Sequence, residues 1–232
     1  MSAESYIGNE LELFSKAHHW KAYFSSQIRP FLGQNVLEVG AGIGGTTTVL
    51  AQGHVGRWTC LEPDHDLARS LQKAVGSSTC ETVVGTLGDV PPDSHFDTIL
   101  YMDVLEHIDD DAEEVELASA KLTAGGHLIV LAPAHQALYS PFDKAVGHYR
   151  RYDKKSLQSA ISEGLELVRL RYLDSAGLIA SAGNRFISKS SSPTPAEITL
   201  WDSWMVPVSR RLDPLLGYLL GKSLLGVWRR RA

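Results

Sequence analysis

The sequence has few cysteines, no long apolar run and no signal-like start, and each shortage excludes a class of protein. Its two cysteines, Cys60 and Cys80, fall in or beside predicted buried strands. They are expected to be structural thiols rather than the disulfide framework of a secreted domain. No uncharged apolar stretch approaches the ~18 residues needed to span a bilayer, and the residues after Met1 are polar and small. A cytoplasmic location without a membrane span is therefore expected.

Positive charge is also scarce. The net charge is −5, and no run of Lys or Arg precedes the C-terminal Arg229-Arg230-Arg231. A nucleic-acid-binding protein usually presents a basic face, so this class of partner is disfavoured. The tail is expected to be solvated, although beside the preceding apolar segment it leaves weak peripheral contact with an anionic membrane open. The expected oligomeric state is a monomer or a homodimer.

Strands and helices alternate along most of the chain. With 232 residues, 44% hydrophobic and 21% charged, the composition suits one soluble domain with an elaboration. The alternation predicts an α/β fold with a parallel, doubly wound sheet. Strands are predicted at Asn35–Val39, Arg57–Leu61, Thr79–Val84, Phe96–Met102, Gly126–Leu131, Leu165–Leu173 and Ser223–Trp228, and helices at Asn9–Arg29, Thr46–Gln52, His65–Val75, Asp110–Leu122 and Asp153–Glu163.

A glycine cluster follows the first of these strands. Gly40, Gly42 and Gly45 fit the pattern G-x-G-x-x-G of a nucleotide-binding strand–turn–helix unit. Glu62 comes about 20 residues later, where a carboxylate can accept bonds from both hydroxyls of a ribose. Glu38 lies two residues before the first glycine and is poorly placed for the pyrophosphate of a dinucleotide. A carboxylate there suits the cationic S-adenosylmethionine (SAM), which has no phosphate.

These residues, together with later strand ends, resemble the class I SAM-dependent methyltransferases. The resemblance rests on Glu38-x-Gly40-x-Gly42, Leu61-Glu62-Pro63-Asp64, the segment 83–89 and the segment 96–107, in the family order across residues 36–132. It implies a Rossmann-like fold with a seven-stranded, mainly parallel sheet in the order 3-2-1-4-5-7-6 and helices on both faces. Within the single domain 1–232 it implies a helical cap (1–33), a cofactor-binding core (34–175), a helical insertion over the active site (176–221), and a last strand with the basic tail (222–232).

The resemblance also implies a cofactor site. Glu38, Gly40, Ala41 and Gly42 would face the methionyl part of SAM. Glu62 would bind the ribose. The remaining implied contacts are Pro63, Thr86 and Leu87 around the adenine, and Asp103, Val104 and His107 near the methionyl end. Family members often have an Asp directly after the third strand for the adenine amine. Here Gly85-Thr86 stands at that position, so backbone groups of Thr86 or Leu87 are the alternative.

The segment Asp103-Val104-Leu105-Glu106-His107 resembles the ubiquinone O-methyltransferases and the fatty-acid cyclopropane synthases. In those relatives the Glu-His pair borders the acceptor site, and some bind a divalent cation there. His107 is therefore a candidate catalytic residue. The alternative is that Glu106 and His107 only brace a turn. No pair of histidines has convincing metal-ligand spacing, and no metal is predicted.

The long loop after the fifth strand, residues 133–152, is rich in His, Tyr and Arg. In an open α/β sheet, ligands lie at the carboxyl ends of the strands, where this loop begins. His148 is the candidate general base because its unperturbed pKa lies near neutrality, and Arg150 or Arg151 is a candidate for holding an acceptor carboxylate or phosphate. The alternative is that the loop residues only anchor the loop. The predicted acceptor contacts are Tyr139, His148, Tyr149, Arg150, Arg151 and Tyr152.

The function predicted from these motifs is SAM-dependent methyl transfer to a small molecule. Oxygen is favoured as the acceptor atom over nitrogen or carbon because of the ubiquinone-type motif. Two alternatives stay open: an NAD-dependent oxidoreductase on the same glycine loop, and a non-catalytic SAM-binding module.

Overall fold

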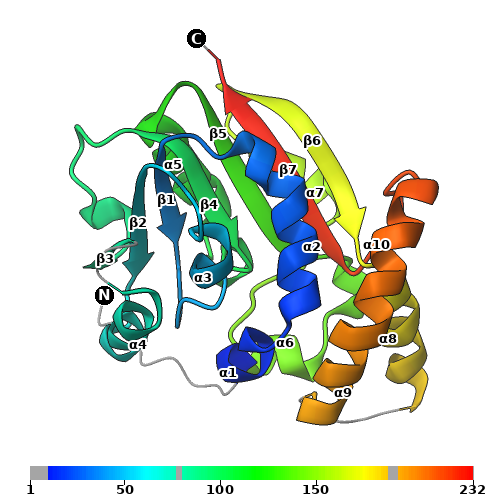
Figure 1. Cartoon of the computed structure of the whole chain (residues 1–232). Coiled ribbons are helices and arrows are strands. Elements are labelled where there is room, and N and C mark those ends of the chain that lie inside the picture. The colour runs from blue at the N-terminus through cyan, green and yellow to red at the C-terminus, as the bar shows by residue number, and fades with distance from the viewer. Residues whose placement is uncertain (1–9, 77–79, 188–192, 232) are drawn as a thin grey trace.

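Seven strands form one sheet in the order β3-β2-β1-β4-β5-β7-β6, and only β7 runs antiparallel to its neighbours (Figure 1). The computed structural model describes residues 10–76, 80–187 and 193–231. The predicted strand order is therefore confirmed. The strands are β1 (Asn35–Val39), β2 (Arg57–Glu62), β3 (Glu81–Val84), β4 (Phe96–Met102), β5 (Leu122–Pro133), β6 (Leu165–Leu173) and β7 (Ser223–Arg230).

The central strands are apolar along most of their length because both of their faces are covered. Leu37, Ile99 and Leu128 face one layer of helices, and Val36, Leu100 and Ile129 face the other. All six are fully buried. The carboxyl ends of the parallel strands meet at the lower edge of the sheet in Figure 1. This edge is called the carboxyl edge below.

Each face of the sheet has its own helical layer. One face packs against α2 (His18–Ile28), α3 (Thr47–Leu50) and α4 (His65–Val75), which contribute Tyr23, Leu50 and Leu71 to its core. The other packs against α5 (Asp111–Lys121) and α7 (Lys154–Ser159) through Val115 and Leu157. Side-chain caps set where these helices begin: the carboxylates of Asp64, Asp110 and Asp153 accept bonds from the first-turn amides of α4, α5 and α7.

The N-terminal segment is not the single helix predicted from the sequence. It forms α1 (Glu10–Ser15), α2 and a 3-10 turn (Arg29–Phe31), with a break at Lys16-Ala17; Asn9 lies outside the described residues. The break lets Ala17 enter the core with no exposed surface. It also turns α1 onto the glycine loop, where Leu11 lies 3.6 Å from the position of a Cβ added at Gly42.

The segment before β7 is helical, as predicted. It contains α8 (Ser175–Ile187), α9 (Pro195–Leu200) and α10 (Val206–Leu215), with a π-helical turn at Trp201–Met205. Buried aspartates tie it to the rest of the chain: Asp202 accepts bonds from the backbone N–H groups of His19 and Trp20, and Asp213 accepts from the Tyr23 hydroxyl. The side chains of Asn184, Arg185 and Phe186, and residues 188–192 of the Ser/Pro-rich break, lie outside the described part of the chain.

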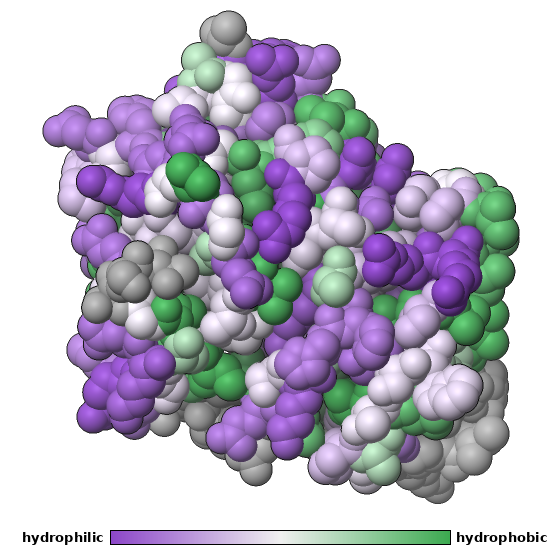
Figure 2. Space-filling view, viewed as in Figure 1, coloured by the Kyte–Doolittle hydropathy of each residue, from purple (hydrophilic) through white to green (hydrophobic). Residues whose placement is uncertain are grey.

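One face of the last two helices exposes apolar side chains at helical spacing. Trp204 is 72% exposed and Leu215 82% exposed, with Val208 and Leu212 on the same stripe and Leu219 exposed just beyond the end of the helix. Hydrophobic surface gathers on the right of Figure 2, where Figure 1 draws α8 and α10. A contiguous patch of this kind is typical of a contact surface. No helix in the described ranges is long and apolar enough to cross a membrane.

The basic tail does not lie beside this stripe. Arg229 pairs with His127, and Arg230 pairs with Leu165 at the first residue of β6, so β7 carries both arginines to the edge opposite the carboxyl edge. Arg230 donates to the backbone oxygen of Ala120 at 3.0 Å. Arg229 is exposed, so the expectation of a solvated tail holds there, but it is wrong for Arg230, and neither arginine adjoins the apolar stripe.

Candidate active site

The glycine loop lies at the carboxyl end of β1. Gly40, Gly42 and Gly44 have φ values of 66°, 57° and 82°, a region that side chains other than glycine rarely adopt. At Gly40 space is also short, because a Cβ would lie 2.8 Å from both methyl groups of Val104. The loop therefore packs directly on the segment that follows β4, and the implied cofactor residues Gly40, Ala41, Gly42 and Val104 come together at one place.

Glu62 joins this loop to the end of β2. Its carboxylate is 5% exposed and accepts bonds from the N–H groups of Gly42 at 2.8 Å and Asp64 at 2.9 Å. Burial raises the pKa of Glu62, although these two bonds oppose the shift. Each carboxylate oxygen has a second lone pair, so Glu62 can hold the loop and still accept bonds from a ligand. The neighbouring Pro63 is exposed.

The two implied adenine contacts after β3 differ in exposure. Thr86 is exposed, and both its N–H and its hydroxyl donate to Asp89, at 2.8 and 2.9 Å. Leu87 is only 1% exposed, because its side chain is part of the core. Backbone groups are what Leu87 can offer to a ligand in this conformation.

Glu38 lies beneath the glycine loop rather than on its surface. The carboxylate is 1% exposed and accepts a bond from the Trp58 indole at 3.0 Å. Burial raises the pKa of Glu38 to about 7, although contacts with Thr47 and Trp58 act in the opposite direction. In this position Glu38 offers almost no exposed surface to a ligand above the loop.

Three residues with left-handed backbone follow β4, β5 and β6 at the carboxyl edge. Asp103 after β4, His135 after β5 and Asp174 after β6 have φ values of 56°, 66° and 69°. Such conformations are uncommon outside glycine and gather at functional sites. Solvent reaches the Asp103 side chain, yet burial raises its pKa to about 6, against the opposing charges of His148 and Lys222. Asp103 is therefore an exposed carboxylate at the carboxyl edge, close enough to His148 and Lys222 to interact with their charges.

Asp143, His148 and Arg151 form a hydrogen-bonded group in the loop after β5. Asp143 lies in α6 (Pro141–Ala145), is fully buried, and accepts a bond from His148 Nδ1 at 2.9 Å. Arg151 donates to both of its oxygens, at 2.7 and 2.9 Å. Burial alone would raise the pKa of Asp143, but the bonds from His148 and Arg151 hold it well below its usual range. A carboxylate on Nδ1 leaves the Nε2 lone pair of neutral His148 available to accept a proton.

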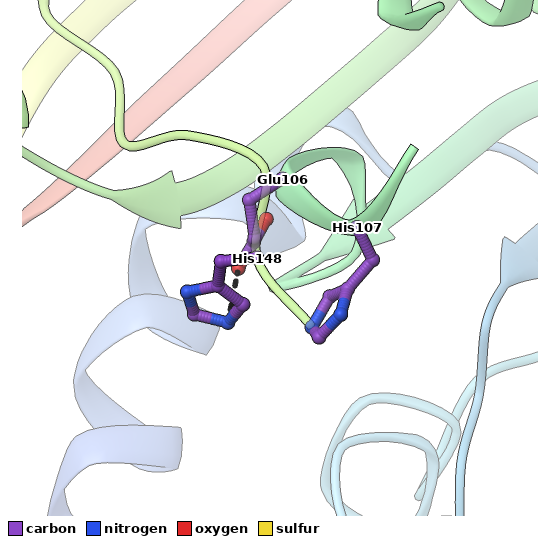
Figure 3. A group of neighbouring side chains, drawn as sticks. All are labelled: Glu106, His107 and His148. Carbon is purple, nitrogen blue, oxygen red and sulfur yellow. Dashed lines mark ion pairs between the residues drawn. The ribbon is translucent and has the colours of Figure 1, made fainter. Parts of the chain in front are cut away.

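Glu106 and His107 face this group from the 3-10 turn Leu105–His107 (Figure 3). Glu106 is fully buried, and neither of its oxygens has a hydrogen-bond partner among the described residues. One oxygen lies 4.0 Å from His148 Nε2. The rings of His107 and His148 are 4.6 Å apart and nearly perpendicular.

These surroundings disfavour charge on both residues of the turn. Burial, followed by the charge of Asp103, raises the pKa of Glu106 well above its usual range. Burial, followed by the charge of His148, lowers the pKa of His107 to about 4. Ligand atoms of Glu106, His107 and His148 lie within 4.8 Å of one another, a spacing that would also admit a metal ion.

The other predicted acceptor contacts have partners inside the protein. The Tyr139 hydroxyl donates to the His148 backbone oxygen, and the Tyr149 N–H donates to the Glu106 backbone oxygen, while the Tyr149 ring is 55% exposed. Arg150 and Tyr152 both bond Asp111, at 2.8 and 2.7 Å. These bonds are the ones expected if the residues anchor the loop rather than contact an acceptor. Contact of these four residues with an acceptor stays a prediction.

Several residues at the carboxyl edge were missed in the sequence. Trp201 comes from the insertion, and Lys222 stands directly before β7 with its ammonium 4.7 Å from the centre of the Trp201 ring. Lys21 of α2 is 6% exposed and lies 3.1 Å from the position of a Cβ added at Gly45. One signal could have found Lys222: a last strand that runs antiparallel must begin at the carboxyl edge.

Comparison with known proteins agrees with this geometry. A family model described as a methyltransferase domain matches residues 37–130, which span the glycine loop, Glu62 and the turn that carries Glu106 and His107. No curated protein matches the chain by sequence.

Solved structures resemble the chain over nearly its full length. A methyltransferase candidate from Haloferax volcanii, in complex with the Trm112 methyltransferase activator, has a TM-score of 0.67 at 15% identity and covers 97% of this chain and 100% of its own. A sarcosine dimethylglycine methyltransferase candidate from Galdieria sulphuraria has a TM-score of 0.61 at 16% identity, over 91% and 84%. The N-methyltransferase NodS of Bradyrhizobium japonicum, bound to S-adenosylhomocysteine (SAH), has a TM-score of 0.59 at 16% identity, over 94% and 88%. At these identities the likeness shows the fold alone.

Proposed function

We propose that the chain is a class I SAM-dependent methyltransferase that transfers the methyl group of SAM to an oxygen atom of a small-molecule acceptor. The match of residues 37–130 to a methyltransferase domain supports this family. His148 is the general base in this proposal. The observation that carries it is the Asp143–His148 bond of 2.9 Å near Asp103 at the carboxyl edge.

The residues at the carboxyl edge fit such a cofactor. SAM supplies a methyl group on a positively charged sulfur and presents an ammonium, a carboxylate and ribose hydroxyls. The carboxylates of Glu62, Asp103 and the buried Glu38 suit the hydroxyls and the positive charges. Lys21, beside the glycine loop, suits the cofactor carboxylate. The carboxylates around the glycine loop suit a cofactor without phosphate groups better than the pyrophosphate of a dinucleotide. This arrangement therefore favours SAM over NAD.

The acceptor side is built for proton removal. A neutral His148 accepts the hydroxyl proton at Nε2, and Asp143 stabilises the resulting imidazolium through Nδ1. Arg151 keeps Asp143 ionised and in place. Burial raises the pKa of Glu106 well above its usual range, which favours the neutral form of this carboxyl group beside His148. A hydroxyl needs a base at neutral pH far more than a neutral amine does, so this arrangement supports oxygen as the acceptor atom.

The choice of cofactor is tested by calorimetry with SAH and with NAD. We expect SAH to bind and NAD not to bind. Tight binding of NAD without binding of SAH would overturn the proposal in favour of an oxidoreductase. Binding of SAH with no methyl transfer to any member of a broad panel of phenols, alcohols and amines would favour the alternative of a SAM-binding module.

The role of His148 is tested by the variant His148→Ala, with His65→Ala at the exposed start of α4 as the matched control. Turnover is measured as SAH release with a hydroxyl acceptor found in that panel. We expect His148→Ala to lower turnover by about 10²–10⁴-fold while SAH affinity is retained and the control is unchanged. A near-normal rate would leave His148 as part of the loop structure.

The remaining contacts and partners in this proposal are less specific. His107 borders the methyl position, and Tyr139, Tyr149, Arg150 and Tyr152 shape the acceptor loop.

The protein acts in the cytoplasm as a monomer or a homodimer, without nucleic acid. The exposed stripe of α10 is the surface we expect a second copy to use, and light scattering of Trp204→Glu against the unmodified protein tests this.

A further inference from the structure

Lys222 is held at the carboxyl edge by the ends of two strands. Its backbone oxygen accepts a bond from Ala134 N–H at 2.8 Å, just past β5, and its N–H donates to Asp174 at 3.1 Å, just past β6. Gly221 packs so closely that a Cβ there would lie 2.2 Å from the Leu173 backbone oxygen. The lysine is therefore presented from a fixed backbone rather than from a loose loop.

The ammonium of Lys222 has no fixed acceptor. It lies over the Trp201 ring, 4.7 Å from the centroid, and the side chain is partly buried. Among the residues that the structure describes, no oxygen accepts a hydrogen bond from Nζ or forms an ion pair with it within 4.0 Å. A lysine ammonium has three donors and is strongly hydrated, so a recessed one is favourable only if a ligand or water satisfies those donors.

The other cations of this region are already engaged. Both guanidinium contacts of Arg151 go to Asp143, and Arg150 is paired with Asp111. Lys21 donates to the Ser15 backbone oxygen at 2.6 Å and lies beside the glycine loop, on the cofactor side. Lys222 lies on the other side, among the ends of β5, β6 and β7, where its charge acts on Asp103 together with that of His148.

We propose that Lys222 binds a carboxylate of the acceptor, so that the substrates of this enzyme are small carboxylic acids that also carry the group to be methylated. This inference rests on the proposed function. A single ammonium that already interacts with the negative charges of Asp174, Asp103 and Asp143 suits a monoanion better than a phosphate dianion. The face of the buried Trp201 ring supports Nζ from one side, so the ligand is expected to approach the ammonium from the other.

The test uses benzoate and its neutral isostere benzamide as probes, titrated into the SAH complex of the full chain. Measurements at pH 8 keep Asp103, with its pKa of about 6, ionised. We expect benzoate to bind at least tenfold more tightly than benzamide, Lys222→Met to abolish this preference, and Lys222→Arg to restore part of it. SAH affinity should stay within about twofold in both variants, which also shows that they fold.

The other outcomes distinguish a failure of the carboxylate site from a failure of the proposed function. Equal binding of benzoate and benzamide to the unmodified complex, or a preference that survives in Lys222→Met, overturns the carboxylate site. Failure of the unmodified protein to bind SAH overturns the proposed function instead. If Lys222→Met weakens SAH but not 5′-methylthioadenosine, which lacks the carboxylate, then the anion on Lys222 is that of the cofactor and the acceptor assignment is wrong.

Discussion

Replacing Glu38 by glutamine should stabilise the protein at alkaline pH and leave its stability at acidic pH nearly unchanged. The carboxylate is 1% exposed beneath the glycine loop, and burial raises its pKa to about 7 from 4.5. Glutamine has nearly the same shape, and its carbonyl can accept the bond from the Trp58 indole. The substitution Glu38→Gln therefore removes the charge and keeps the contact.

The sign and size follow from the two pKa values. The folded protein holds the proton of Glu38 more tightly than the unfolded chain, so the free energy of unfolding falls as pH rises above 4.5 and levels off past about 7. The two pKa values differ by about 2.5, and at about 1.36 kcal/mol for each pKa unit this corresponds to about 3 kcal/mol lost at pH 8.5. The glutamine side chain carries no charge at either pH and escapes this loss.

Urea unfolding followed by circular dichroism at pH 5 and pH 8.5 measures the difference. The variant should match the parent protein at pH 5 within about 1 kcal/mol and exceed it by about 3 kcal/mol at pH 8.5. Glu163→Gln, at an exposed position, is the control and should change neither value. A Glu38→Gln variant that is no more stable at pH 8.5 than at pH 5, relative to the parent, would refute the buried-charge argument.

Three further predictions concern the site. Glu62→Ala should weaken SAH binding by about 1–3 kcal/mol, the scale for losing bonds to a charged group, and unchanged affinity in calorimetry would mean that the ribose contact is misplaced. Asp143→Asn should lower turnover by at least about tenfold and move the acidic limb of the pH–rate profile to lower pH, since the imidazolium loses its counter-charge; an unmoved limb with normal turnover would remove Asp143 from the mechanism. Turnover should survive EDTA, and its loss with recovery on adding a divalent cation would instead make Glu106, His107 and His148 metal ligands.

Local pattern was enough to predict where the strands lie, while the strand order came from the family resemblance. Apolar runs and alternation placed β4 and β6 at their observed bounds, and the predicted bounds of α4 also match. The N-terminal segment failed because the helical spacing of its apolar residues does not reveal a break: Ala17 is buried by contacts with elements far along the chain.

The motifs predicted which residues belong to the candidate site, but not the directions in which their side chains point. The sequence identifies Glu38 as acidic, yet only the packing of Trp58 against it shows that it points beneath the loop. The sequence does not reveal the role of Asp143. That role arises because the loop after β5 folds so that His148 and Arg151 both bond the Asp143 carboxylate. Lys222 matters because the reversed direction of β7 brings the residue before it to the carboxyl edge, which no local motif reveals.

The most direct test of the account is a crystal structure of the protein with SAH. The account predicts the adenosine hydroxyls on Glu62, the methionyl carboxylate toward Lys21, and the sulfur directed at the space between Asp103 and Nε2 of His148. A complex in which the sulfur of SAH points away from His148 would contradict the account. So would a parallel NAD complex in which the glycine loop binds the pyrophosphate.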